Sequence, residues 1–223
     1  MVKRKGYVWK QHGSRDYMPY MFGVRHSIEY IPTTIDVLQT LEITDKSFLL
    51  EIAEYPIIFP NKAYPWREDA NFYMYWNAVS SYIVSQGGKI IPGNNENIEK
   101  KYKSNFKEIH DKYYPHDLKK YWDKYAPIRK RIVNEYVLEK DAHYIKVIDE
   151  EKPYAVLLGN WHTLNLKEEI SCNYHQLNFK KEVFKFGNKL RRMFPLEDIV
   201  NITAAYKSKF PNKRIDYNAI IKF

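Results

Sequence analysis

Cysteine is almost absent from this chain, which holds one thiol, Cys172, in 223 residues. A single thiol cannot form an intramolecular disulfide, and this excludes a secreted scaffold stapled by such bonds. Long apolar runs are also missing: no stretch approaches the roughly 20 apolar residues that span a bilayer, and the basic segment 1–10 lacks the apolar core of a signal peptide. We therefore expect a cytoplasmic protein that does not enter a membrane.

Familiar phosphate-binding and nucleophile motifs are missing as well. The sequence contains no G-x-x-x-x-G-K-[ST] and no G-x-G-x-x-G, which argues against a P-loop and against a dinucleotide-binding turn. It contains no G-x-S-x-G nucleophile motif and no deaminase pattern of H-x-E with P-C-x-x-C. From these absences we expect no cofactor.

Acidic residues are in the minority, because 27 Asp and Glu stand against 36 Lys and Arg, for a net charge of +9. A positive surplus of this size speeds the encounter with polyanions and supports contacts with phosphate groups. The chain is also rich in lysine, isoleucine, asparagine and tyrosine, whose codons are typical of an AT-rich genome such as that of a phage, a virus or a low-GC bacterium. An anionic partner is therefore expected.

The apolar pattern predicts an α+β (mixed α/β) fold with a small, mostly antiparallel sheet. Two pairs of strand-forming runs, each separated by a polar turn, predict two β-hairpins, 41–43 with 48–52 and 144–148 with 154–158. Further short strands are expected at 57–59, 199–204 and 215–221. Strands followed by helices and then by strands do not predict a regular alternation of the two.

Apolar residues at helical spacing predict a helix that begins near Pro65, continues to Ile83 and ends at Gly87. The segment 96–140 predicts three helices with breaks at Pro115 and Pro127, because proline disrupts a helix interior. A basic helix is expected over 179–194. We expect one domain, 1–223, with a helical lobe over 96–140.

Basic residues alternate with aromatic ones in the central helices, and a second basic stripe recurs at three- and four-residue steps in the predicted helix 179–194. Cations neutralise phosphates and aromatic faces stack on bases, so this pattern predicts a nucleic-acid surface. The alternative is that the rings form the core and the lysines form the solvated face. The predicted phosphate-binding residues are Lys119, Lys120, Lys124, Arg129, Lys130, Arg131, Lys181, Lys185, Lys189, Arg191 and Arg192.

Three groups of polar residues are weaker candidates for chemistry. Cys172 and His175 have a spacing that zinc accepts, with His162 nearby, but a fourth ligand is missing, so we expect a structural cysteine and no metal. The pairs His110–Asp111 and His116–Asp117 could move protons or ligate an ion. Carboxylates in or beside the first predicted hairpin could hold Mg²⁺, namely Glu42, Asp45, Glu51 and Glu54.

Together these features favour a nucleic-acid-interacting accessory protein of a phage, virus or mobile element that binds through phosphate contacts. The first alternative is a small enzyme, a transferase or a metal-dependent nuclease, with His162 or the carboxylates of the first hairpin as candidate groups. The second alternative is an inhibitor that binds an acidic protein partner through the same positive face. The position of the basic residues distinguishes these functions, because a binder spreads them over a surface and an enzyme rings a pocket.

Overall fold

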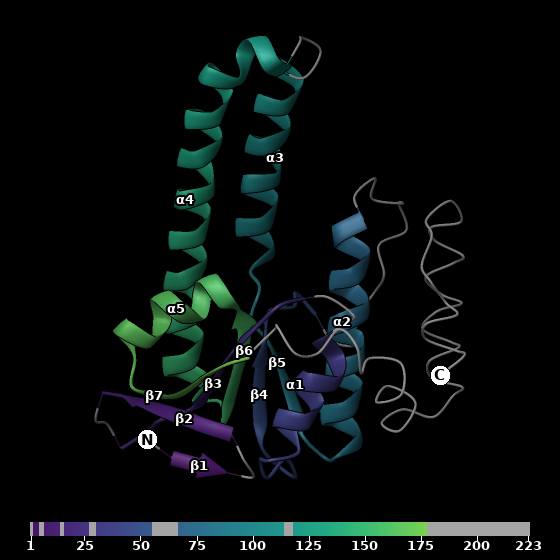
Figure 1. Cartoon of the computed structure of the whole chain (residues 1–223), viewed down its shortest axis with the longest axis vertical. Helices are drawn as coiled ribbons and strands as arrows, with labels where there is room; N and C mark the ends of the chain where they lie inside the picture. Colours follow the sequence, from purple (N-terminus) through teal and green to yellow (C-terminus); the bar gives the residue numbers. More distant parts are fainter. Residues whose placement is uncertain are drawn as a thin grey trace. The chain divides into compact units, whose positions relative to one another are not determined.

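The computed structural model describes residues 2–4, 7–13, 16–26, 30–54, 67–113 and 118–177. Strands and helices alternate along most of this part of the chain (Figure 1). Its strands are β1 (Val2–Arg4), β2 (Tyr7–His12), β3 (Tyr20–Val24), β4 (Ser47–Leu50), β5 (Lys89–Pro92), β6 (Ala155–Gly159) and β7 (Cys172–Gln176). Its helices are α1 (Ile31–Leu38), α2 (Arg67–Ser85), α3 (Glu96–Tyr113), α4 (Leu118–Glu151) and α5 (Asn160–Glu169).

The seven strands form one sheet in the order β1-β2-β7-β3-β6-β4-β5. The five strands from β7 to β5 are parallel, whereas β2 pairs antiparallel with β7 and with β1. The mixed α/β fold predicted from the sequence is confirmed. The expectation of a mostly antiparallel sheet is wrong, and so is the expectation that strands and helices do not alternate regularly.

Neither predicted hairpin forms. Residues 41–46 are a loop after α1, and β4 lies between β5 and β6 as a parallel strand. Residues 144–148 belong to the last turns of α4, and β6 is a central parallel strand. A short apolar run does not by itself distinguish a strand from a buried helical segment, and a polar turn between two runs does not tell whether they pair.

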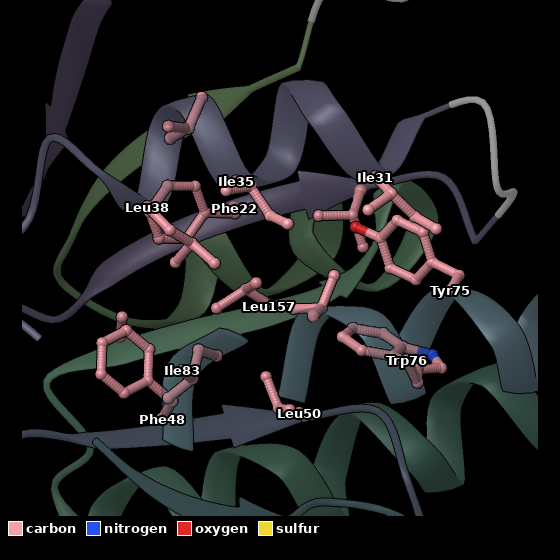
Figure 2. Close-up of a cluster of buried hydrophobic side chains, with 14 of the residues drawn as sticks. Phe22, Ile31, Ile35, Leu38, Phe48, Leu50, Tyr75, Trp76, Ile83 and Leu157 are labelled. Carbon is pink, nitrogen blue, oxygen red and sulfur yellow. The ribbon is translucent and has the colours of Figure 1, made fainter. Parts of the chain in front are cut away.

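Helices α1 and α2 cover one face of the sheet. Phe22, Phe48, Leu50 and Leu157 extend from β3, β4 and β6 into a buried cluster with apolar side chains of these helices (Figure 2). Side chains along one strand alternate between the two faces of the sheet. These four side chains all lie on the face that α1 and α2 cover. This layer holds the three strands in fixed register at their carboxyl ends.

Helix α5 covers the opposite face over β3, and Gly23 permits its close approach. A Cβ atom at position 23 would lie 2.2 Å from Oδ1 of Asn160 and 2.7 Å from Oγ1 of Thr163, both in the first turn of α5. No side chain other than that of glycine fits against the helix at this distance. The glycine therefore fixes where α5 begins and where its first side chains lie.

The predicted helix ending at Gly87 is confirmed. Helix α2 ends at Ser85, Gly87 has a φ of 79°, and the N–H of Gly88 donates to the carbonyl of Ile83 at 3.0 Å. This is the left-handed cap that glycine favours. Pro127, in contrast, lies inside α4 and does not break it, so the expectation of a helix boundary there is wrong.

The chain divides into two compact units, one formed by residues up to Pro92 and from Pro153 onward, the other by Gly93–Lys152. In the second unit α3 and α4 pack through Ile98, Tyr102, Ile109 and Ile132. No helix in the described part of the chain is long and apolar enough to span a bilayer. The predicted elements at 57–59, 179–194, 199–204 and 215–221, and Pro115, lie outside the described residues.

Candidate active site

The neighbouring parallel strands β3 and β6 are followed by connections on opposite faces of the sheet. The chain leaves β3 towards α1 on one face, and it leaves the neighbouring strand β6 towards α5 on the other face. At such a point the two connections separate and open a crevice outside the carboxyl ends of the strands, where open α/β sheets bind their ligands. The residues that follow β3, β4 and β6 are therefore the first place to look for a site.

Three ionisable side chains meet there, one from each of these connections. His26 follows β3, Glu51 follows β4 directly, and His162 is in the first turn of α5 after β6. Nε2 of His26 lies 3.1 Å from Oε2 of Glu51, and Nε2 of His162 lies 3.6 Å from Oε1. One carboxylate thus has an imidazole at each of its oxygens.

Glu51 is held firmly in this position. Glu51 is only 6% exposed, and its Oε2 accepts a 2.7 Å hydrogen bond from the backbone N–H of Gly159. A Cβ atom at position 159 would lie 3.1 Å from Cε1 of His26 and 3.2 Å from Oε2 of Glu51, so a larger residue would crowd both. A buried carboxylate is costly unless it is paired and hydrogen-bonded, and here it is both.

His26 is enclosed by aromatic rings of α2. The centroid of its imidazole lies 5.1 Å from that of Phe72, 5.9 Å from that of Tyr75 and 5.1 Å from that of Trp76. Burial raises the pKa of the Tyr75 phenol well above its usual range, so this hydroxyl stays protonated at neutral pH.

The contact between His26 and Glu51 is close but poorly aligned. Nε2 of His26 is buried, and no described residue forms an aligned hydrogen bond with it, although Oε2 of Glu51 is within 3.1 Å. The His26 side chain is 20% exposed, against 10% for that of His162. His26 is therefore the most exposed member of the cluster.

The donor set of this cluster, two imidazole nitrogens and one carboxylate, is one that catalytic zinc sites use. Among the described residues, however, no group of three or more His, Cys, Asp and Glu side chains is arranged to hold a metal ion. The two oxygens of Glu51 each face a different imidazole, so the side chains close on one another instead of on a common centre. As they stand, they form a cluster of paired ionisable side chains.

Of the residues singled out in the sequence, Glu51 and His162 come together, and His26 was missed. The signal that could have found it is a repeated spacing, because Gly23-Val24-Arg25-His26 and Gly159-Asn160-Trp161-His162 both place a histidine three residues after a glycine at the end of an apolar strand. In both cases the glycine lies against residues of the site region. The pattern thus carries structural information that neither histidine carries alone.

The zinc-like spacing of Cys172 and His175 does not bring the two together. Both lie in β7, where residues three apart point to opposite faces of the sheet. Cys172 is buried, and burial raises the pKa of its thiol to about 11, so it is no nucleophile at neutral pH. The structure thus supports the expected structural cysteine.

The other acidic candidates do not join Glu51, because Glu42, Asp45 and Glu54 are exposed. His110 and Asp111 lie on α3 in the other unit, and Asp111 pairs with Lys107, which lowers the pKa of the carboxyl. The residues 116 and 117 lie outside the described part of the chain.

The predicted phosphate-binding residues fall into three groups. Lys124, Arg129, Lys130 and Arg131 are exposed on α4, and Arg131 faces Glu135 at 3.8 Å. Lys119 and Lys120 also belong to α4. The residues of the second basic stripe lie outside the described residues, namely Lys181, Lys185, Lys189, Arg191 and Arg192.

The aromatic residues interleaved with these cations are occupied in packing. Tyr102 and Tyr136 lie between α3 and α4 with ring centroids 5.1 Å apart, and their hydroxyls donate to Glu139 and Glu99. Tyr102 is buried and Tyr136 is partly buried. These contacts favour the helical-core alternative for the two tyrosines, and the stacking surface stays a prediction.

Comparison with known proteins gives no relative for this chain, because no family model, no curated protein and no solved structure matches it.

Proposed function

We propose that this protein is a hydrolytic enzyme whose active centre is the cluster of His26, Glu51 and His162. The observation that carries the proposal is the buried Glu51 carboxylate with an imidazole nitrogen at each oxygen, placed where parallel sheets bind ligands. Clusters of titratable groups in a crevice are candidates for acid–base catalysis because their proton affinities depend on one another.

A purely structural role explains this cluster poorly. Buried charged groups add little net stability compared with apolar side chains of similar size, so a buried carboxylate with a histidine at each oxygen calls for another reason. The position adds to this argument, since His26, Glu51 and His162 come from three separate connections and not from one local turn.

The roles follow from geometry and exposure. With the Nε2 proton of His26 facing Glu51, Nδ1 is the nitrogen that accepts a proton from an attacking water. The water oxygen forms a bond to the electrophilic carbon or phosphorus of the substrate, and the bond to the leaving group breaks. The leaving group then takes up the proton, while the Glu51 carboxylate stabilises the imidazolium.

A test compares hydrolysis of a panel of carboxylic and phosphoric esters by the purified protein and by three variants. We expect Glu51→Gln and His26→Asn to lose activity by about a hundredfold or more, the range for removal of a general base. Glu54→Gln is the matched control, because Glu54 is an exposed carboxylate three residues further on. Equal activity of Glu51→Gln and the parent protein would contradict the proposal.

The same assays are run with a chelator and with added Zn²⁺ or Mn²⁺. Because the three side chains close on one another instead of on a common centre, we expect the activity to survive the chelator. Activity that requires the cation would contradict the assignment of the His26 imidazole as the base.

A second function has its own support, namely binding of a nucleic acid through phosphate contacts. Lys124, Arg129 and Lys130 are exposed within a seven-residue segment of α4, in a chain of net charge +9. Since Tyr102 is buried and Tyr136 partly buried where α3 packs on α4, we base this binding on the cations and not on stacking by these rings.

A further inference from the structure

Trp76 holds a buried polar group whose presence in the core needs an explanation. The residue is 0% exposed, and its Nε1 has no hydrogen-bond partner among the described residues. Buried N–H groups are nearly always paired, and one that is not marks strain, a bound water or a functional contact.

The indole lies next to the proposed active centre. Its ring centroid is 5.1 Å from that of His26. In Figure 2 Trp76 lies on the side of the apolar cluster towards which the arrowhead of the strand with Leu50 points, and its nitrogen is on the far side of the ring from Leu157. Glu51 follows Leu50 directly, so this side of the apolar cluster is also the side of the carboxyl end of β4.

The buried hydroxyl of the neighbouring Tyr75, in contrast, has a hydrogen-bond partner. The Tyr75 hydroxyl is 2.7 Å from Oγ1 of Thr34, which in turn donates to the carbonyl of Tyr30. Tyr75 is thus already part of a hydrogen-bond network within the core. Of the three rings around His26, only that of Trp76 brings a donor that is not used in this way.

We propose that Nε1–H of Trp76 donates a hydrogen bond to the substrate oxygen that gains negative charge when water attacks. This inference rests on the proposed hydrolytic function and adds a fourth residue to it. As the water oxygen bonds to the carbon or phosphorus, the electron pair of the C=O or P=O bond moves to this oxygen. A fixed donor already in place stabilises that charge without reorganisation.

The closed surroundings of the indole favour this role. Water does not reach Nε1, and an electrostatic contact is stronger where water is excluded. Two partly exposed side chains lie against the indole, those of His26 and Phe72. A substrate that displaces the His26 ring would reach the N–H, and the base and the donor would then contact adjacent atoms of the same group.

The test replaces the N–H without changing the shape of the ring. Trp76→3-benzothienylalanine keeps both fused rings and has sulfur in place of the nitrogen. We expect its kcat to fall by about a hundredfold, the usual effect of losing one such donor, with KM changed by about threefold or less. Its melting temperature should not fall, because an unpaired buried donor has been removed.

The matched control is Thr33→Val, which removes another buried polar atom without a hydrogen-bond partner among the described residues, in α1. Its kcat should equal that of the parent protein. If the benzothienyl variant also keeps its kcat within about threefold, the inference is overturned. Its failure is distinct from failure of the proposed function, since the latter is read from Glu51→Gln alone.

Discussion

The backbone N–H of Gly159 donates a 2.7 Å hydrogen bond to Oε2 of Glu51, across a separation of 108 residues in the chain. This bond connects the carboxyl end of β6 with that of β4 and fixes one oxygen of the carboxylate. The side chain can then present its second oxygen to His162, 3.6 Å away. A structural hydrogen bond and a proposed catalytic contact thus share one side chain, and substitutions can separate them.

Substitutions at Glu51 should separate activity from stability. Glu51→Gln keeps an oxygen that can accept from Gly159, so we expect its free energy of unfolding to change by about 1 kcal/mol or less. Glu51→Ala leaves that N–H and the imidazoles without the carboxylate, and should cost about 1–3 kcal/mol. Both should lose hydrolysis. Thermal melting and ester hydrolysis on the same samples check this, and equal stability of the two variants would contradict it.

Gly23→Ala should disturb α5. The added methyl group would lie 2.2 Å from Oδ1 of Asn160, so the helix must shift, at a cost of about 1–3 kcal/mol. Because His162 is carried by the same helical turn, hydrolysis should fall as well. The double variant Gly23→Ala with Asn160→Ala relieves the nearest contact and should recover part of the stability in denaturant unfolding. No recovery would mean that Thr163, 2.7 Å from the methyl group, sets the limit.

Cys172 predicts a loss of stability at alkaline pH. Burial raises the pKa of its thiol from 9.0 to about 11, so the folded state binds its proton more tightly than the unfolded state. The stability that depends on the protonated thiol is present in full below pH 9 and is lost between about pH 9 and 11. The loss in free energy of unfolding amounts to roughly 2–3 kcal/mol. Urea unfolding at several pH values should therefore show a smaller alkaline decrease for Cys172→Ala than for the parent protein.

The same residue should be chemically inert in the folded protein. A thiol-specific reagent near pH 8 should label Cys172 slowly under native conditions and rapidly in denaturant, because the thiolate is both buried and scarce. Rapid native labelling would show that β7 opens readily.

The exposed cations of α4 predict salt-dependent binding of nucleic acid. Changing Lys124, Arg129 and Lys130 to Glu should weaken binding by at least about tenfold at low salt and flatten its dependence on salt concentration. Lys146→Glu is the control, since this exposed lysine lies further along α4 and faces Glu150 at 3.8 Å. Fluorescence anisotropy with single- and double-stranded oligonucleotides measures both. Binding that is unchanged in the triple variant would leave these cations as a solvated face.

Local features of this fold were predictable from the sequence. The periodic spacing up to Ile83 and the glycine at position 87 define α2 because both signals lie within the helix itself. Residues 144–148 were misassigned because Tyr144 and Ile148, both buried, fit a strand as well as one side of a helix. The length of the helical segment would have identified these residues as helix. The helix break expected at Pro127 made that segment look shorter than it is.

The strand order was beyond such reasoning. Strand β6 pairs with β3 and β4, each more than a hundred positions earlier in the chain, and no local pattern records these partners. The cluster depends on the same pairings, so Glu51 and His162 could be named separately but not joined. Only the repeated glycine–histidine spacing at the ends of β3 and β6 hinted that the two strands end at a common place.

The place of β6 between β3 and β4 also determines when the cluster of His26, Glu51 and His162 can first assemble during synthesis. A nascent chain that ends at Pro92 already has both neighbours of β6, but not the strand that joins them, and Gly93–Lys152 must be made before it emerges. At about 5–20 residues per second this takes several seconds. During that time the inner edges of β3 and β4 lack their native partner, so the growing chain needs protection from aggregation. His26 and Glu51 are synthesised early, yet they meet only when the ribosome has passed His162.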